Sequence, residues 1–226
     1  MIKKTFIICF KLFFGFFAFT ILLVGVYKYV NPPVTPLMIM RMSQGKATGI
    51  DYRWRSFDNI SPNVFRAVIG AEDAKFFRHE GVDWKAVKNA QRYNKIKKGR
   101  KVRGGSTISQ QTAKNVFLTH HRSYVRKGLE LYFTYLIEYI WGKKRILEVY
   151  ANVVEWAPGV YGAEAAAEHH FHKHASELTK REAALMSVVL PNPIRWSASS
   201  PTPYIKSRAN WAQGRMGSIS LRSITE

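Results

Sequence analysis

Glu72 is the first residue whose position could support chemistry. It lies in GAEDAKFFRHEG, residues 70–81, where two adjacent acids meet two large aromatic residues. If one helix covers this segment, apolar spacings of three and four place Glu72 on the apolar face and turn Asp73 about 100° away. A carboxylate on a buried face is partly desolvated, which raises its pKa and suits it to accept a proton. A salt bridge between Glu72 and a neighbouring Lys or Arg is the alternative that the spacing leaves open.

A long basic segment is the second chemical feature. Residues 84–129 contain 13 Lys or Arg and no Asp or Glu. Such a run is either a solvated basic face or the wall of a groove that binds an anionic ligand. Within it, residues 94–105 are polar, basic and glycine-rich, which predicts a mobile flap over the groove. Arg126 and Glu130 are four residues apart on a predicted helix, a spacing that ordinary ion pairs share.

The composition indicates a folded protein with anionic partners. Hydrophobic residues make up 46% of the 226 residues, enough for a sizeable core, and the formal net charge is +20. Cys9 is the only cysteine, which excludes an internal disulfide and a cysteine-based zinc site. The sequence contains neither a P-loop nor a G-x-G-x-x-G segment, so nucleotide binding has no support. Four histidines between residues 169 and 174 lack an H-E-x-x-H pattern, and we expect no bound metal.

The N-terminus is expected to anchor the chain in a membrane. Phe6–Tyr27 contains 22 residues with a single charge and is long enough to cross a hydrocarbon layer of about 30 Å. No small-residue cleavage site follows, so we expect an uncleaved transmembrane helix rather than a signal peptide. The three lysines within residues 3–11 favour a cytoplasmic N-terminus. Residues 1–30 are therefore predicted to form a cytoplasmic tip and anchor, and residues 31–226 a domain outside the inner membrane, where nucleic acid is an unsuitable partner.

Helix signals dominate the rest of the chain. Strand signals are few, so the predicted fold is mainly α. Capping residues and apolar periodicity predict helices over residues 35–45, from Ser61, over 84–98, from Ser106 or Thr107, over 123–141, from Lys143, after Gly162, from Thr179 and over 204–216.

Four segments resemble, in order, the motifs of one family. EDAKFFRHEG (72–81), GGSTISQQTAKN (104–115), RKGLE (126–130) and ILEVYANVVEWAPGVYGAEAAAEHHF (146–171) are similar to the motifs of the peptidoglycan glycosyltransferases of family 51. The resemblance covers residues 50–195 and implies a lysozyme-like, two-lobed, mainly helical domain with a smaller, membrane-facing lobe. Because few residues follow the match, we expect a monofunctional enzyme without a transpeptidase domain, anchored in the bacterial inner membrane with its catalytic domain in the periplasm.

The resemblance also implies an activity and roles for particular residues. The expected reaction is polymerisation of lipid II into β-1,4-linked glycan strands, with release of undecaprenyl pyrophosphate. Glu72 is expected to be the general base and Glu130 the second essential glutamate. The expected partners are lipid II, the growing strand, the inner membrane and other cell-wall synthesis or division proteins. No cofactor is expected, and assistance by a divalent cation stays open. The implied substrate-binding residues are Asp73, Phe76, His79, Ser106, Thr107, Gln110, Gln111, Lys114, Asn115, Arg126 and Lys127.

Two other functions remain as alternatives. One is a lysozyme-like lytic transglycosylase, which also uses a carboxylate beside a sugar, although a neutral glycan gives the basic segment no partner. The other is a non-catalytic scaffold that binds anionic lipid, for which Glu72 would be dispensable. Four positions depart from the family motifs: Ser109, Ala151, His170 and His172 stand where threonine, leucine, tyrosine and glycine are common.

Overall fold

Helices dominate the computed structural model, which describes residues 2–47, 49–97, 104–119 and 123–225. The predicted mainly α fold with one N-terminal apolar helix is confirmed. The helices are α1 (Ile2–Tyr29), α2 (Pro36–Ser43), η1 (Phe57–Asn59), α3 (Pro62–Glu72), η2 (Phe76–Arg78), α4 (Trp84–Ile96), α5 (Ile108–Phe117), α6 (Tyr124–Val153), α7 (Ala163–Phe171), η3 (Ala175–Glu177), α8 (Lys180–Val189), α9 (Pro203–Met216) and α10 (Arg222–Thr225), where η marks short 3-10 helices. The strands β1 (Asp51–Tyr52), β3 (Val160–Tyr161) and β2 (Glu155–Ala157) form a sheet in that order, with β1 parallel and β2 antiparallel to β3.

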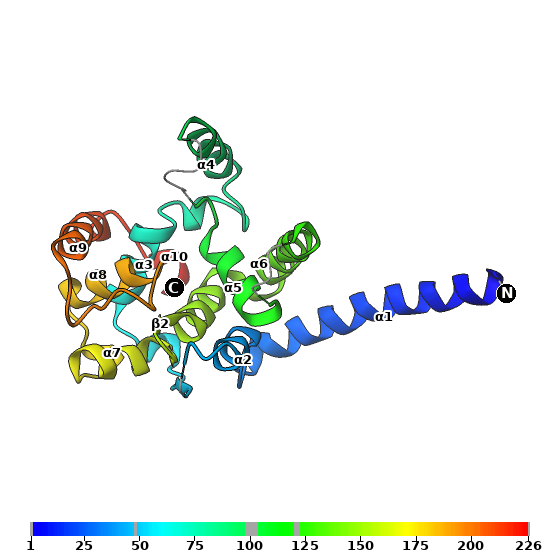
Figure 1. Ribbon diagram of the computed structural model, residues 1–226, viewed down its shortest axis with the longest axis horizontal. Coiled ribbons are helices and arrows are strands. Elements are labelled where there is room, and N and C mark those ends of the chain that lie inside the picture. Colours follow the sequence, from blue (N-terminus) through cyan, green and yellow to red (C-terminus); the bar gives the residue numbers. More distant parts are fainter. Residues whose placement is uncertain (1, 48, 98–103, 120–122, 226) are drawn as a thin grey trace.

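The α1 helix is long and apolar enough to cross a membrane. In Figure 1 its N-terminal part projects alone, whereas its C-terminal part lies against the body of the molecule. There the Thr20 and Tyr132 hydroxyls are hydrogen-bonded at 2.8 Å, and the Trp141 indole N–H donates to the Val24 carbonyl at 2.7 Å. The Arg145 guanidinium donates to carbonyls at the end of α1, which the helix itself leaves without partners. Specific polar contacts therefore hold the apolar helix to the body.

The body has a continuous apolar core around α6. α5 packs along α6, and α3 packs against α6, α8 and α9. Phe65 of α3, Ile137 and Tyr150 of α6, and Trp156 of β2 are fully buried and tie these elements together. α4 stands apart from this core at the top of Figure 1. The core thus fixes α3, α5 and α6, which carry most of the predicted site residues.

Side-chain caps set several of the predicted helix boundaries. The Thr35 hydroxyl accepts a hydrogen bond from the first turn of α2. Thr107 and Thr179 begin capping boxes on α5 and α8. The break predicted between residues 141 and 143 is a kink inside α6 at Gly142, whose φ of 74° is accessible to glycine at low cost. Local sequence chemistry therefore places these elements correctly.

The helix that carries Glu72 is shorter than predicted. α3 ends at Glu72, and Asp73 leaves the helical conformation with φ −152° and ψ 70°. Phe76 belongs to the separate turn η2. The prediction that Asp73 turns away from the apolar face is therefore wrong, because the helix on which it depends has already ended. Asp73 is only 7% exposed.

The sequence does not predict the short strands or the short C-terminal helix. The strands and α10 span too few residues to show a periodic pattern. The turn between β2 and β3 requires Gly159, where φ is 75° and a Cβ atom would lie 2.5 Å from the Gly49 carbonyl oxygen. The predicted helix over 84–98 ends at Ile96. Residues 98–103, half of the predicted flap, lie outside the described residues.

Candidate active site

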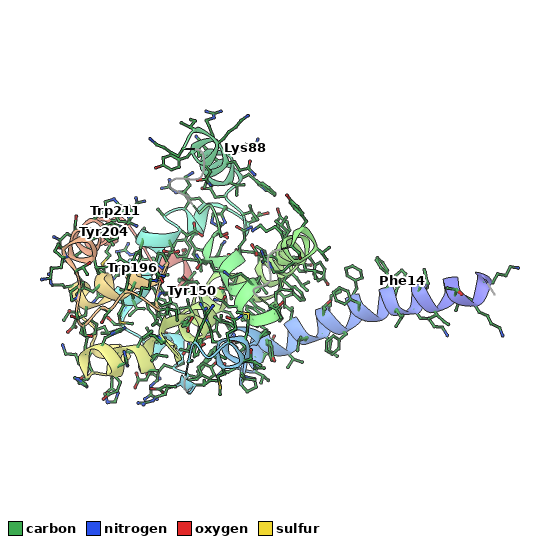
Figure 2. The ribbon with its side chains drawn as sticks, viewed as in Figure 1. Phe14, Lys88, Tyr150, Trp196, Tyr204 and Trp211 are labelled. Atoms are coloured by element: carbon green, nitrogen blue, oxygen red, sulfur yellow. The ribbon has the colours of Figure 1, made fainter. Side chains whose placement is uncertain are left out.

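Hydrogen bonds link Glu72, at the end of α3, to side chains of the helices α5 and α6. Its Oε2 accepts a hydrogen bond from Gln111 Nε2 of α5 at 2.9 Å. Gln111 Oε1 in turn accepts a hydrogen bond from the Tyr150 hydroxyl of α6 at 3.3 Å. Tyr150, labelled near the centre of Figure 2, is fully buried and holds Gln111 from the core side. This chain of hydrogen bonds fixes the Glu72 carboxyl at the end of α3.

Desolvation dominates the protonation of Glu72. Burial raises the pKa of this carboxyl, although the hydrogen bond from Gln111 and the positive charges of Arg208 and Lys114 act in the opposite direction. The residue as a whole keeps some exposed surface. Its hydrogen-bond partner in the described part of the chain is a neutral amide, so the salt-bridge alternative is not supported. A carboxylate in this state is suited to take a proton from a ligand.

Glu130 has the opposite environment. It is 3% exposed, and Arg126 Nη1 donates to its Oε2 at 2.6 Å. Lys127 Nζ donates to the other oxygen, Oε1. Arg126 Nε is buried without a hydrogen-bond partner among the residues that the structure describes. The four-residue spacing of Arg126 and Glu130 therefore forms the ion pair that the sequence suggests, and Glu130 orients a second cation as well.

Lys114 of α5 lies within electrostatic range of these cations. Burial lowers the pKa of its ammonium group, while the Glu130 carboxylate acts in the opposite direction. The positive charges of Arg41, Arg126 and Lys127 lower this pKa further. We call Arg41, Lys114, Arg126 and Lys127 the cation cluster. Such a concentration of positive charge suits an anionic ligand.

Asp73 joins the end of α3 to the start of α5. Its carboxylate accepts hydrogen bonds from His79 Nε2 and from the Ile108 backbone N–H, both at 3.0 Å. The Ile108 N–H is one of the donors that the first turn of α5 leaves open. The Thr107 hydroxyl donates to the Gly81 carbonyl. Through these contacts Asp73, His79 and Thr107 hold the end of α3 against the start of α5, and so help to position Glu72.

Phe76 and Asn115 are also buried. Lys143 Nζ lies 4.5 Å from the centroid of the Phe76 ring. It also donates to Glu138, which accepts a second hydrogen bond from Ser109. No sequence pattern predicts this network, because its members come from three separate elements. It supports the η2 turn from the side of α6.

Ser106 marks the open side of the site. It is exposed and lines a pocket together with Trp84, Gly105, Gln110 and Lys127. The pocket lies between α4 and the packed helices α5 and α6. It therefore gives a ligand access to one edge of the cation cluster.

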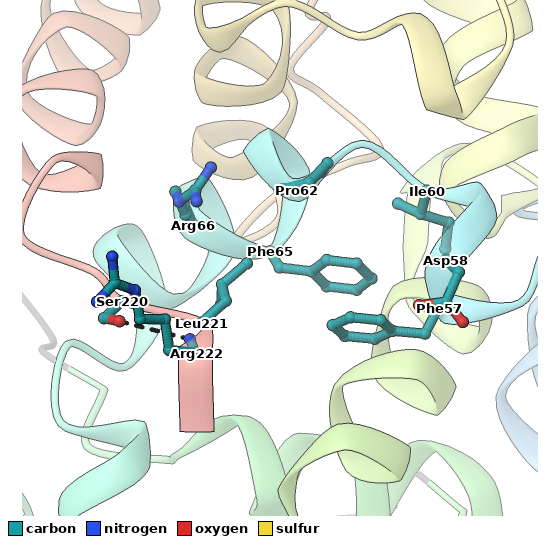
Figure 3. A pocket seen from close by; sticks show the side chains of 9 residues that line it. All are labelled: Phe57, Asp58, Ile60, Pro62, Phe65, Arg66, Ser220, Leu221 and Arg222. Carbon is teal, nitrogen blue, oxygen red and sulfur yellow. Dashed lines mark hydrogen bonds between the residues drawn. The ribbon is translucent and has the colours of Figure 1, made fainter. Parts of the chain in front are cut away.

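Another pocket lies away from the predicted residues. Figure 3 shows it between η1, the start of α3 and residues 220–222, where the rings of Phe57 and Phe65 stack at 4.2 Å. None of the predicted site residues lines it. We therefore place the site at Glu72 and the cation cluster.

The four histidines between residues 169 and 174 have different structural settings. α7 ends at Phe171, so His170 and His174 do not share a helix face. Burial lowers the pKa of His170 to about 4, whereas His174 Nδ1 lies 2.9 Å from Glu164 Oε1. Within residues 2–47, 49–97, 104–119 and 123–225, no group of three or more His, Cys, Asp or Glu side chains could hold a metal ion.

The departures from the family motifs have different structural settings. His172 ends α7 in the left-handed conformation, with φ 54°, which glycine adopts at lower cost. Ser109 keeps the hydroxyl that a threonine would offer and donates it to Glu138. Ala151 is buried in the core, and His170 is buried beside the Trp156 carbonyl.

A desolvated carboxylate can take a proton from an attacking hydroxyl, and a nearby cluster of cations can stabilise an anionic leaving group. Together they suit a group-transfer reaction. The profile of the transglycosylase family matches residues 41–217, so the chain belongs to the transglycosylase family. It is similar to proteins named biosynthetic peptidoglycan transglycosylase. The relative from Caulobacter vibrioides is 51% identical over 197 residues, which cover 87% of this chain and 84% of the relative. The relative from Shewanella oneidensis is 45% identical over 230 residues, which cover 100% of this chain and 98% of the relative.

Proposed function

We propose that this protein polymerises lipid II into β-1,4-linked glycan strands of peptidoglycan and releases undecaprenyl pyrophosphate. The observation that carries the proposal is the contrast between a desolvated Glu72 with a neutral partner and the nearby cation cluster. The name that the relatives share, biosynthetic peptidoglycan transglycosylase, supports a peptidoglycan substrate.

In this proposal Glu72 acts on the acceptor. Its carboxylate takes the proton of the acceptor's sugar 4-hydroxyl as that oxygen bonds to the anomeric carbon of the donor. A hydroxyl is a poor nucleophile, and a positioned base contributes about 10²–10⁴-fold to such a step. Gln111 and Tyr150 keep the carboxyl in place for each proton transfer.

The cation cluster acts on the donor. As the bond between the anomeric carbon and the pyrophosphate oxygen breaks, its electron pair stays on the pyrophosphate. Fixed cations stabilise this developing charge more than they stabilise the bound substrate, so Lys114 and Arg126 contribute mainly to kcat. Glu130 holds Arg126 and Lys127 in position. Attack from the side opposite the leaving group inverts the anomeric carbon.

The membrane helix fits a substrate with a hydrocarbon chain. An apolar groove runs between α1, α2, α5 and α6, lined among others by Phe16, Leu23, Ile39 and Phe117. We propose that α1 spans the inner membrane and that residues 31–226 lie in the periplasm, as the N-terminal lysines favour. A C-terminal alkaline phosphatase fusion should then be active, and an inactive fusion would contradict this orientation.

We further propose that the reaction needs no cofactor. The cation cluster supplies at the pyrophosphate the positive charge that a divalent ion supplies in many other enzymes. The rate with lipid II should therefore survive EDTA treatment. Loss of activity that added Mg²⁺ restores would contradict this part of the proposal.

Purified lipid II and the full-length protein test the function directly. We expect glycan strands on a gel and, in a parallel incubation with cell-wall sacculi, no soluble muropeptides. Muropeptide release without polymer would favour the lytic enzyme. Absence of both products would favour the non-catalytic scaffold.

A further inference from the structure

Arg41 lies outside the four family motifs, in the last turn of α2. This helix is the first element after the membrane helix. Its inner face is fixed by Leu37 and Met38, which are buried and pack with Tyr161 of β3. Arg41 follows these two residues by four and three positions, so it lies on the same inner face of α2.

A buried carboxylate fixes the direction of the Arg41 side chain. Arg41 Nε donates to Glu155 Oε2 of β2 at 2.7 Å, and Glu155 is 3% exposed. The Tyr161 hydroxyl donates to the other oxygen of Glu155 at 3.5 Å. The Arg41 side chain itself is 20% exposed. Its contact with Glu155 uses Nε, and within the described residues its two Nη nitrogens have no hydrogen-bond partner.

The packing of α2 brings Arg41 to the donor side of the site. α2 packs against α5, the helix that carries Lys114. Both helices also line the apolar groove, α2 through Pro36 and Ile39 and α5 through Val116 and Phe117. Arg41 is also near enough to Lys114 for its positive charge to lower the pKa of Lys114, although burial, Arg126 and Lys127 lower this pKa more.

The cation cluster is not neutralised by its own carboxylates. Glu130 pairs with Arg126 and Lys127, and Glu155 pairs with Arg41. Four cations against these two carboxylates and the ionised Glu72, on which Lys114 also acts, leave one net positive charge in a partly buried region. Like charges held together in this way repel one another, and an anion with two or more negative charges relieves the repulsion.

We propose that Arg41 is a further phosphate-binding residue of the donor site. Glu155 holds Nε, and the Nη nitrogens donate to an oxygen of the substrate's pyrophosphate. The planar guanidinium suits this double use, because one edge binds a carboxylate while the other stays open to a phosphate. This inference rests on the proposed function for the identity of the ligand. It makes the helix next to the membrane anchor part of the substrate site.

Paired variants separate binding from stability. Arg41→Gln alone leaves Glu155 buried without its cation and should lower Tm as well as activity. The double variant Arg41→Gln with Glu155→Gln removes both charges, so its Tm should recover most of the loss. Its kcat/KM with lipid II should stay about 10-fold or more below wild type, as expected for a lost charged hydrogen bond. Arg53→Gln, at an exposed arginine that pairs with Asp51, is the matched control and should have normal activity.

Calorimetric titration with inorganic pyrophosphate gives a readout that does not depend on polymerisation. The double variant should bind pyrophosphate about 10-fold more weakly than wild type, and Arg53→Gln should bind it equally well. A double variant with wild-type Tm, kcat/KM and pyrophosphate affinity would overturn the proposal and leave Arg41 as a structural partner of Glu155. Pyrophosphate binding that depends on Arg41, in a wild-type protein that makes no glycan, would support this inference and contradict the proposed function alone.

Discussion

The two glutamates of the site differ in their neighbours. Glu72, at the end of α3, accepts a hydrogen bond from the neutral Gln111 amide, and burial raises its pKa. Glu130, within α6, is paired with Arg126 and Lys127. A carboxylate that is to take a proton must not be neutralised by a bound cation, whereas one that orients cations must be paired with them. The same residue type therefore serves two purposes, and its neighbours determine which.

Glu72→Gln should have the largest effect on activity. Glutamine keeps the shape of the side chain and can still hydrogen-bond Gln111, but it cannot take a proton. We expect kcat to fall by about 10²–10⁴-fold. Single-turnover polymerisation of lipid II measures the loss, with lipid II binding and Tm as controls that should stay close to wild type. A variant that polymerises at a substantial rate would remove the distinction between Glu72 and Glu130.

Lys114→Ala should have the next largest effect, a loss of polymerisation activity on the order of 10²-fold. The loss should be mainly in kcat, because the cation acts most strongly as charge develops on the departing pyrophosphate. Steady-state kinetics with lipid II separate kcat from KM. Near-normal turnover would leave Arg126 and Lys127 as the main donor contacts.

Glu130→Gln should combine a smaller rate loss with a stability loss. Breaking a fully buried ion pair costs about 3–5 kcal/mol, and the cost here should be about 1–2 kcal/mol because the Lys127 side chain is 44% exposed. Because Glu130 positions Arg126, which contributes mainly to kcat, the released cations should lower kcat more than they raise KM for lipid II. Thermal unfolding and steady-state kinetics check both parts. A variant that matches Glu72→Gln in lost kcat, with unchanged Tm, would mean that Glu130 also acts in proton transfer.

Glu164 is a matched glutamate outside the site. Although burial opposes it, hydrogen bonds from Arg55, the Ala175 N–H and His174 lower the pKa of Glu164 to about 2. Because the folded-state pKa is depressed, its stabilising effect is present above the ordinary pKa of 4.5 and is lost as pH falls towards 2.

Glu164→Gln should therefore destabilise the protein by about 1–3 kcal/mol at pH 7 and hardly at all near pH 2. The loss should be smaller than for a fully buried ion pair, because the Arg55 side chain is 45% exposed. Turnover per folded molecule at pH 7 should be unchanged. Unfolding curves at several pH values measure the difference, and a pH-independent loss would contradict the assigned ion pair.

His172→Gly should have the smallest effect, and it should raise the stability of the protein rather than lower it. A residue with φ 54° costs less as glycine, so we expect a gain of about 0.5–1 kcal/mol. For a chain of this size that corresponds to an increase in Tm of about 1–4 °C. A lower Tm would mean that the His172 side chain makes a stabilising contact.

The sequence predicts the partial desolvation of Glu72 because α3 carries a regular apolar pattern up to that residue. It misplaces Asp73 because periodicity cannot show that the helix ends at Glu72. The Arg126–Glu130 pair is local, so spacing alone suggests it. The capping boxes of α5 and α8 are predictable for the same reason.

Contacts between distant segments could not be predicted in this way. Arg41 lies 114 residues before its partner Glu155, and Tyr150 lies 39 residues after Gln111. Neither pair leaves a periodic signal, because tertiary packing alone brings the partners together. Arg208 likewise acts on Glu72 from α9, far outside the predicted residues.

The pH dependence of kcat tests the central claim, that Glu72 works as an ionised base with a raised pKa. Wild-type polymerisation should fall as pH drops through a pKa above the ordinary value of 4.5. The Gln111 hydrogen bond and the Arg208 charge both lower this pKa, so Gln111→Leu and Arg208→Gln should each move the acid limb to higher pH. An acid limb that stays in place in both variants, or that persists unchanged in Glu72→Gln, would contradict the account.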